Sequence, residues 1–245
     1  MSDFLHTSDT IPEGLGWTHF CPMHLTWIAA AVIFTVVLSL LYRRCGEEKR
    51  AILRKALALA LIADELFKMV CLFIGGNYRA TYLPLHLCSI NIIFIAIHAW
   101  KSSKLLDNFL YAICIPGAVA ALLFPTWVKL PPTSFMYWHS FTVHVLLIAY
   151  PIAVAAGGDL KLHARYIPRC LLFLAALALP IYGVNLLFDT NFMFLMRADA
   201  GNPLQLFEKL LGSHLWGFPI IGAAVFTVMY VPLHLRRRRK EKVNV

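Results

Sequence analysis

Seven long apolar runs fill most of the 245-residue chain. A helix of about 20 mostly apolar residues crosses the ~30 Å hydrocarbon core of a bilayer, and each run is close to that length. Lipid offers the backbone no hydrogen-bond partners, and the runs lack the two-residue alternation of barrel strands. The sequence therefore predicts an all-α membrane protein, a seven-transmembrane-helix bundle in a single domain over residues 1–245. Its expected spans are approximately 23–42, 56–74, 83–100, 109–127, 135–156, 170–188 and 215–235.

The basic residues predict the orientation of this bundle. Lys and Arg gather in alternate connections and in the tail, within residues 43–55, 101–104, 161–169 and 236–242. The connections on the opposite side hold only Arg79, Lys129, Arg197 and Lys209. By the positive-inside rule, the N-terminus lies outside and the C-terminus inside. This asymmetry accounts for the net charge of +9, so we expect no nucleic-acid partner.

The connection Asp189–His214 is too long for a tight turn and contains an amphipathic stretch, Leu204–Leu211. We expect it to form a structured cap on the outer surface. The six cysteines form no CxxC pair, so neither structural zinc nor a disulfide framework is predicted. The chain also lacks a Gly-rich phosphate loop and an HExxH motif. No metal and no soluble cofactor is therefore expected.

The second span carries Asp64, Glu65 and Lys68 near its middle. Each ionisable group there costs about 2.5–3.5 kcal/mol on insertion scales. The spacings of three and four residues let Lys68 pair with one carboxylate within the helix, while the other must face the bundle interior. Two interpretations remain open. The group is either a structural ion pair or a functional one, in which Glu65 serves a proton relay or orients a partner.

The third span opens with Leu83-Pro84-Leu85-His86-Leu87-Cys88. With Pro84 at the first helical position, Cys88 is expected about one turn inside the helix, ~8 Å below its outer end. His86 and Cys88 then point roughly opposite ways, whereas Asn91 shares the Cys88 face. A thiol in a span is more often a packed core residue than a nucleophile. Cys88 is thus a candidate that needs support from other spans.

Two histidines in the fifth span and an asparagine in the sixth add to this set. His139, expected ~6 Å deep, fits an interfacial aromatic belt, whereas His144, ~13 Å deep, is surrounded by apolar residues. A histidine inside a span is a functional hypothesis by default, although a neutral imidazole can also bridge two helices. Asn185, ~6 Å below the outer end of its span, can bridge helices as well.

These residues share one depth band, the outer half of the bilayer, and no comparable set is expected in the inner half around His98 and Cys114. A thiol, an imidazole and amide donors are the groups that covalent acyl transfer requires. The pattern favours a polar pocket opening to the outer leaflet. Its members would be Glu65, Cys88, Asn91, His144 and Asn185.

The string Leu83–Cys88 resembles the YwaF-like family of bacterial integral membrane proteins. The His144 span, Pro116-Gly117 with Ala121–Pro125, and Asn185 with Thr190–Leu195 support the resemblance. That family is similar to the transmembrane protein 164 cysteine acyltransferases, which load polyunsaturated acyl chains onto ether lysophospholipids. The resemblance implies Cys88 as the acyl-accepting nucleophile and His144 as its partner. Val145 departs from the family, whose members often have glycine after this histidine.

The leading hypothesis is a phospholipid acyltransferase or transacylase, multi-pass in the bacterial plasma membrane. Its partners would be a membrane phospholipid as acyl donor and a lysolipid as acceptor. The supporting site residues would be His86, Asn91, Asn185, Glu65, His139 and Asn191. The alternatives are a non-enzymatic small-solute transporter or receptor-like binding protein, and a passive partner subunit. The lack of a convincing internal repeat argues against a transporter.

Overall fold

The computed structural model describes residues 3–199 and 201–243, with side chains as far as Val231 together with Leu233. Over this range the protein is all-α and contains no strand. The main helices are α1 (Pro22–Arg44), α2 (Glu47–Ile74), α3 (Leu87–Trp100), α4 (Lys104–Phe109), α5 (Ile115–Leu123), α6 (Phe135–Ala156), α7 (Ile167–Phe188), α8 (Leu204–Leu211) and α9 (Gly217–Val243). The short turns are η1 (Ala80–Tyr82), η2 (Leu110–Cys114), η3 (Ala164–Tyr166), η4 (Phe192–Phe194) and η5 (His214–Trp216).

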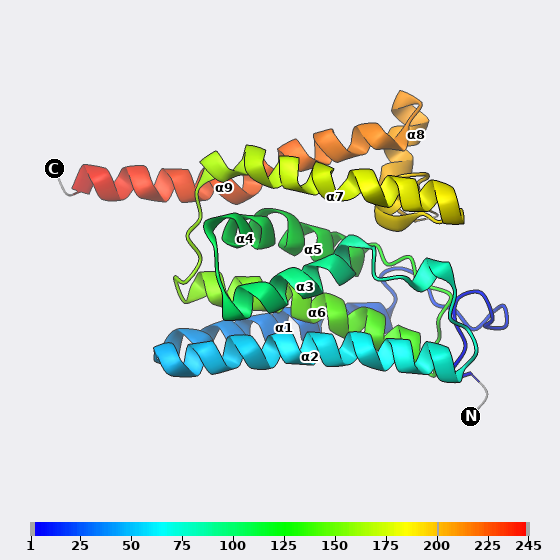
Figure 1. Cartoon of the computed structure of the whole chain (residues 1–245). Helices are drawn as coiled ribbons and strands as arrows, with labels where there is room; N and C mark the ends of the chain where they lie inside the picture. Colours follow the sequence, from blue (N-terminus) through cyan, green and yellow to red (C-terminus); the bar gives the residue numbers. More distant parts are fainter. Residues whose placement is uncertain (1–2, 200, 244–245) are drawn as a thin grey trace.

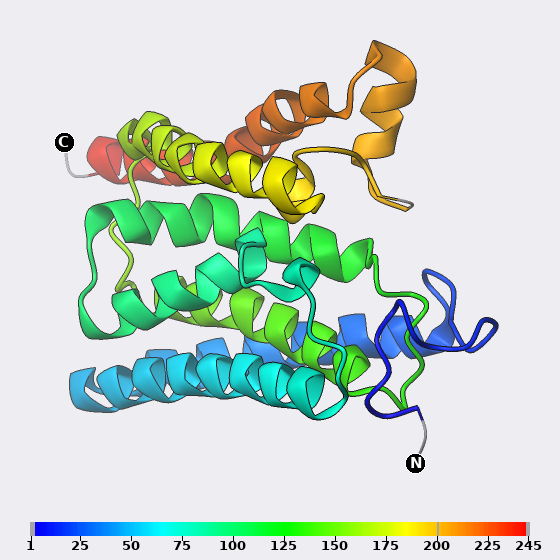
Figure 2. The same cartoon turned by 45° about the vertical axis from the view of Figure 1, so that its right-hand side comes forward.

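The long helices lie in layers with their axes roughly aligned (Figure 1). Helices α1 and α2 form one outer layer, α3, α6 and the α4–α5 segment lie in the middle, and α7 with α9 forms the opposite layer. The turned view in Figure 2 shows the same layers. The amphipathic α8 lies at one end of the α7–α9 layer, and the N-terminal segment lies at that same end of the bundle.

Helix α6 is the central element of the core. It packs against α1, α2, α3 and α5. Its buried residues run along its whole length, from Phe135 to Val154. Pro151 lies inside this helix and has no N–H to donate to the Leu147 carbonyl. The Cys114 thiol, 3.5 Å from that carbonyl oxygen, donates to it instead.

Six helical segments are long and apolar enough to cross a membrane. They are Pro22–Arg44, Ala80–Trp100, Lys104–Leu123, Phe135–Ala156, Ala164–Phe188 and His214–Val231. Helix α2, with 28 residues, is longer than any of these but is less apolar because it carries Asp64, Glu65 and Lys68. The sequence predicts seven spans, and the structure supports six of them by length and composition. The seventh, α2, stays a prediction.

Two differences from the expected helix positions bear on the site and the core. Helix α3 begins at Leu87 with His86 as its N-cap residue, so Cys88 is its second residue and does not lie a full turn inside. His86 is therefore outside the helix, so regular helix geometry does not turn it away from Cys88 as the sequence predicted. The fourth apolar run is helical over residues 104–123 rather than 109–127, with a π-helical turn, η2, before Pro116.

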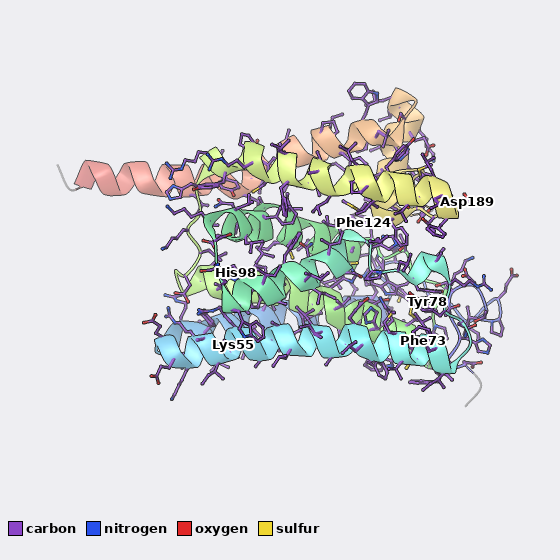
Figure 3. All side chains as sticks on the ribbon, in the orientation of Figure 1. Lys55, Phe73, Tyr78, His98, Phe124 and Asp189 are labelled. Carbon is purple, nitrogen blue, oxygen red and sulfur yellow. The ribbon has the colours of Figure 1, made fainter. Side chains whose placement is uncertain are left out.

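The α1–α2 turn, the α3–α4 connection and the α6–α7 connection meet at one end of the bundle, which we call the basic end. Figure 3 labels Lys55 and His98 towards this end, and Phe73, Tyr78 and Asp189 towards the opposite one, which we call the cap end. The cap end carries the N-terminal segment and α8. The basic tail 236–242 continues α9, but its side chains lie outside those the structure describes.

A charged clamp closes the basic end. Arg50, in the first turns of α2, donates to the carbonyls of Tyr42, Cys45 and Arg43 at the end of α1 and to that of Gly157 at the end of α6. These are helix C-termini, where the macrodipole favours a cation. Asp159 binds both Arg50 and Arg54, each at 3.1 Å, and accepts a hydrogen bond of 2.6 Å from the Tyr42 hydroxyl. The clamp therefore joins α1, α2 and α6.

Replacing Asp159 by Ala should destabilise the protein, because Arg50, Arg54 and the Tyr42 hydroxyl lose their common partner. A hydrogen bond to a charged group contributes about 1.5–3 kcal/mol to stability, and the loss of even one predicts a fall in melting temperature of roughly 3–12 °C for a chain of this size. Thermal unfolding in detergent measures it. Asp9→Ala is the matched control, because its pair with Arg79 spans 3.7 Å between two exposed side chains. Equal melting temperatures for the two variants would contradict the clamp.

Candidate functional site

A cluster of ionisable side chains joins α2 to α6 in the half of the bundle nearer the cap end. Lys68 pairs with Glu65 within α2, and both side chains are largely buried. His139 of α6 faces both carboxylates, with Nδ1 3.0 Å from Asp64 Oδ2 and Nε2 3.7 Å from Glu65 Oε2. The Thr142 hydroxyl, also on α6, donates to Asp64 Oδ1 at 3.2 Å. We call Asp64, Glu65, Lys68 and His139 the carboxylate–histidine cluster.

The contacts show which carboxylate pairs within the helix and which faces the interior. Glu65, three residues before Lys68, forms the ion pair within α2, and Asp64 faces α6. His139 does not sit in an exposed aromatic belt, because only 7% of its surface is exposed. The Lys68 ammonium and the His139 imidazole therefore both face the two carboxylates. These partners matter because unpaired buried charge is costly.

Cys88, the candidate nucleophile, lies at the start of α3 and is partly exposed. It packs against the hydrophobic core, and the Lys68 ammonium and the Glu65 carboxylate lie within electrostatic range of its sulfur. Among the described residues, the structure gives no hydrogen bond between this thiol and a histidine. The pairing of Cys88 with His144 therefore stays a prediction. The structure does bring the thiol and the carboxylate–histidine cluster into one neighbourhood.

His144 is buried in α6, five residues after His139. Its Nδ1 lies 2.6 Å from the Ser140 carbonyl oxygen. A carbonyl can only accept, so Nδ1 carries the proton and Nε2 is left with a free lone pair. The ring stacks on Trp127, with 5.1 Å between centroids and 16° between planes. His144 is thus oriented with Nε2 able to act as a base.

His86, the N-cap residue of α3, connects this neighbourhood to the cap. Its ring packs edge-on against Phe192 at 5.1 Å and lies 6.0 Å from the Phe194 ring. Lys68 and His144 lie within electrostatic range of it. Met193 and Phe194 both have positive φ, 57° and 55°, which L residues seldom adopt. The cap segment that covers His86 is therefore held in a strained conformation.

The amides predicted at the site fall into two groups. Asn185 holds the strained segment, because its Nδ2 donates to the Phe192 carbonyl and its Oδ1 accepts from Phe192 N and from the Thr190 hydroxyl. Asn191 makes similar bonds to the backbone of Met196 and Arg197. Asn91 differs from both. It is 2% exposed, and its Oδ1 has no hydrogen-bond partner.

A second buried polar network, in the half nearer the basic end, was missed by the sequence analysis. His98 Nδ1 lies 2.8 Å from the Tyr150 hydroxyl and its Nε2 3.0 Å from Asp107 Oδ1. Asp107 Oδ2 accepts from Lys161 N, and Asn108 Oδ1 accepts from His163 N and Tyr230. The expectation of no comparable set around His98 was wrong. Asp107 and Asn108 look like polar residues at a helix start, and nothing in their spacing indicates that they face His98 and Tyr230.

A family model described as the TMEM164 family matches residues 15–230. The chain belongs to the TMEM164 family. The matched range contains both polar networks, Cys88 and all six candidate spans up to Tyr230. The protein is therefore a multi-pass membrane protein of this family. No curated protein and no solved structure matches the chain.

The TMEM164 assignment confirms at family level the relation that the sequence motifs indicated. The narrower resemblance to the YwaF-like family stays a prediction, as do the catalytic roles of Cys88 and His144. The family match shows a membrane protein of the TMEM164 family and does not by itself assign a reaction.

Replacing Lys68 by Met should leave Glu65 without its cation beside Asp64. Removing one partner of a buried ion pair costs about 3–5 kcal/mol, so we expect a clear fall in the melting temperature in detergent. Lys209→Met, at an exposed position of α8, is the matched control.

The double variant Lys68→Met with Glu65→Gln should recover much of that loss, because both charges are then removed. If Lys68→Met left the melting temperature unchanged, the Glu65 carboxylate would be stabilised by solvent or lipid rather than by Lys68.

Proposed function

We propose that this TMEM164-family protein is a phospholipid acyltransferase or transacylase that works through a cysteine acyl-enzyme at the outer leaflet. The observation that carries the proposal is a pair of buried polar atoms without a partner. Apart from Thr35 Oγ1, the described buried side-chain atoms with neither a hydrogen bond nor an ion-pair contact are Asn91 Oδ1 and Trp127 Nε1. Asn91 lies on α3, three residues after Cys88, and Trp127 stacks on His144. Buried polar groups are normally paired, so these two atoms are typical of a site that meets a polar ligand.

The proposal includes the topology. The protein is a seven-helix bundle with the N-terminus outside and the C-terminus inside, and α2 is the seventh span. Support for α2 comes from its place beside α1 along the length of the bundle (Figure 1) and from the burial of its charges against α6. With the basic end inside, the carboxylate–histidine cluster and Cys88 lie towards the outer leaflet.

In the proposed first half-reaction, the Cys88 thiol gives its proton to His144 Nε2, and the sulfur attacks the carbonyl carbon of a phospholipid acyl ester. The tetrahedral intermediate collapses, the ester C–O bond breaks, and the leaving alkoxide takes the proton from His144. Cys88 is left as a thioester. The bond from His144 Nδ1 to the Ser140 carbonyl supports this role because it holds the tautomer that has Nε2 unprotonated.

In the second half-reaction, the hydroxyl of a lysophospholipid gives its proton to His144 Nε2 and attacks the thioester. The C–S bond breaks, and the thiolate recovers the proton. Lys68 lies within electrostatic range of the sulfur. Asn185 and Asn191 hold the cap, so Asn91 is the amide left to meet the substrate, and its unpartnered Oδ1 can accept a hydrogen bond from a lipid hydroxyl. His86, between the cap aromatics and the cluster, closes the site on that side.

A proton-coupled small-solute transporter is the second candidate, and one observation favours it. Asp64, Glu65, Lys68 and His139 form a buried group that can exchange a proton, which is a common feature of transporters. In that case Cys88 would be a packed thiol without chemistry. The two candidates differ in whether Cys88 becomes covalently acylated.

Intact-mass analysis after incubation with phosphatidylcholine vesicles tests the enzyme. Wild-type protein should gain the mass of one acyl group, and neutral hydroxylamine should remove it. Cys88→Ala should gain nothing, whereas Cys114→Ala, which removes a buried thiol near Cys88, should behave as wild type.

His144→Asn separates the base from the fold in the same assay. The Asn amide can still donate to the Ser140 carbonyl, but the lone pair of Nε2 is lost. Acylation should slow by roughly 10²–10⁴-fold, the usual contribution of a general base. An acyl adduct that persists in Cys88→Ala, or no adduct in wild type, would favour the transporter.

The orientation is tested by membrane-impermeant maleimide in intact cells, in a Cys21→Ser background. Cys45, partly exposed at the end of α1, should label only after the cells are opened. A cysteine placed by Asp199→Cys should label in intact cells. The reverse pattern would move the proposed site to the inner leaflet.

A further inference from the structure

The indole N–H of Trp127 is a buried donor without a partner. Its Nε1 has no hydrogen bond in the part of the chain that the structure describes. Three other tryptophans at the cap end donate their indole N–H to a hydrogen-bond acceptor. Trp17 donates to the Leu130 carbonyl at 3.0 Å, Trp27 to the Tyr137 hydroxyl at 2.7 Å and Trp138 to the Pro132 carbonyl at 2.8 Å. A buried N–H left unpaired is costly, so Trp127 requires an explanation.

Trp127 lies directly against the proposed base. Its ring is stacked on that of His144, with 5.1 Å between centroids, and it meets the edge of Phe141 at 5.4 Å. The His144 ring is itself fixed by its bond to Ser140. The ring that carries the unpaired N–H is therefore held against the proposed base. A donor beside the reacting groups can meet a negative charge that develops during the reaction.

The loop that carries Trp127 is rigidly held by the N-terminal segment. It follows Phe124, labelled at the end of α5 in Figure 3, and Leu130 N donates back to the Trp127 carbonyl at 3.0 Å. Trp17 N donates to the Val128 carbonyl at 2.9 Å. A Cβ on Gly16 would lie 2.6 Å from that same oxygen, so the close approach requires glycine there. The donor is thus fixed before any substrate arrives.

We propose that Trp127 is an oxyanion donor of this protein, an inference that rests on the proposed Cys88 acyl transfer. When the Cys88 sulfur bonds to the ester carbon, the C=O π electrons move to oxygen, and the Trp127 N–H donates to that oxyanion. When the intermediate collapses, the C=O bond re-forms and the alcohol leaves with the proton held by His144. A preorganised donor of this kind lowers the barrier without any rearrangement during the step.

The test compares two reactions of Cys88 that share the thiolate but differ in the oxyanion. Acylation by p-nitrophenyl octanoate in detergent micelles passes through a tetrahedral oxyanion, and the burst of p-nitrophenol measures its rate. Alkylation of Cys88 by iodoacetamide forms no oxyanion, and peptide mass analysis measures its rate. Trp127→Phe keeps an aromatic ring against His144 but removes the N–H. Trp216→Phe, at an exposed position in η5, is the matched control.

Trp127→Phe should slow acylation by about 10²–10³-fold, the usual effect of losing one oxyanion donor, and leave alkylation unchanged. A parallel loss of both rates would show that the indole acts by holding His144, and would overturn the proposal. Acylation at the wild-type rate would overturn it as well. A wild-type protein without a Cys88-dependent burst would instead defeat the proposed function itself.

A second variant covers the case in which Trp127→Phe does not fold, as judged from its melting temperature. Incorporation of β-(3-benzothienyl)alanine at position 127 replaces the indole N–H by sulfur and keeps the bicyclic shape that packs on His144. The same selective loss of acylation is expected. Normal acylation in this variant would overturn the proposal.

Discussion

The register of α2 against α6 is the constraint on which the rest of the structure depends. The two helices run in opposite directions and are tied at two levels. Arg50 binds the end of α6 through the Gly157 carbonyl and Asp159, and Asp64 faces His139 near the other end of the contact. Asp64 lies fourteen positions after Arg50 on α2, which is ~21 Å of helix. A one-residue slip would break both ties and turn Asp64 towards lipid, where a carboxylate is costly.

The sequence alone predicts the features that depend on how each residue partitions between water and the lipid bilayer. Apolar run length gives the helices, and the positions of Lys and Arg give an orientation, because both reflect the cost of moving groups into hydrocarbon. The spacing of Asp64, Glu65 and Lys68 indicated that one carboxylate pairs within the helix and the other faces inwards, and the structure confirms this. These predictions require only the geometry of an α-helix and the cost of placing charges in a bilayer.

The features that sequence did not predict depend on contacts between distant segments. Nothing local shows that His98 meets Asp107 and Tyr150, or that Trp17 fixes the loop carrying Trp127. Helix boundaries were also misjudged. Pro84 suits a first helical position, but α3 starts three residues later, because Ala80–Tyr82 forms a separate short turn before it. The depth of Cys88 changed with that boundary, and the geometry of the site with it.

The two buried polar networks differ in a way that separates structure from function. Around His98, both ring nitrogens are bonded, both oxygens of Asp107 are bonded, and Asn108 uses its oxygen and its nitrogen. A network so fully satisfied gains nothing from a ligand, and its role is to fix α3, α4 and α6 at the basic end. Near the Cys88 thiol and the oriented His144 imidazole, by contrast, Asn91 Oδ1 and Trp127 Nε1 have no partner among the described residues. Because unpaired buried groups are costly, selection for stability alone would have removed them, and the reactive site is therefore expected at the cap end.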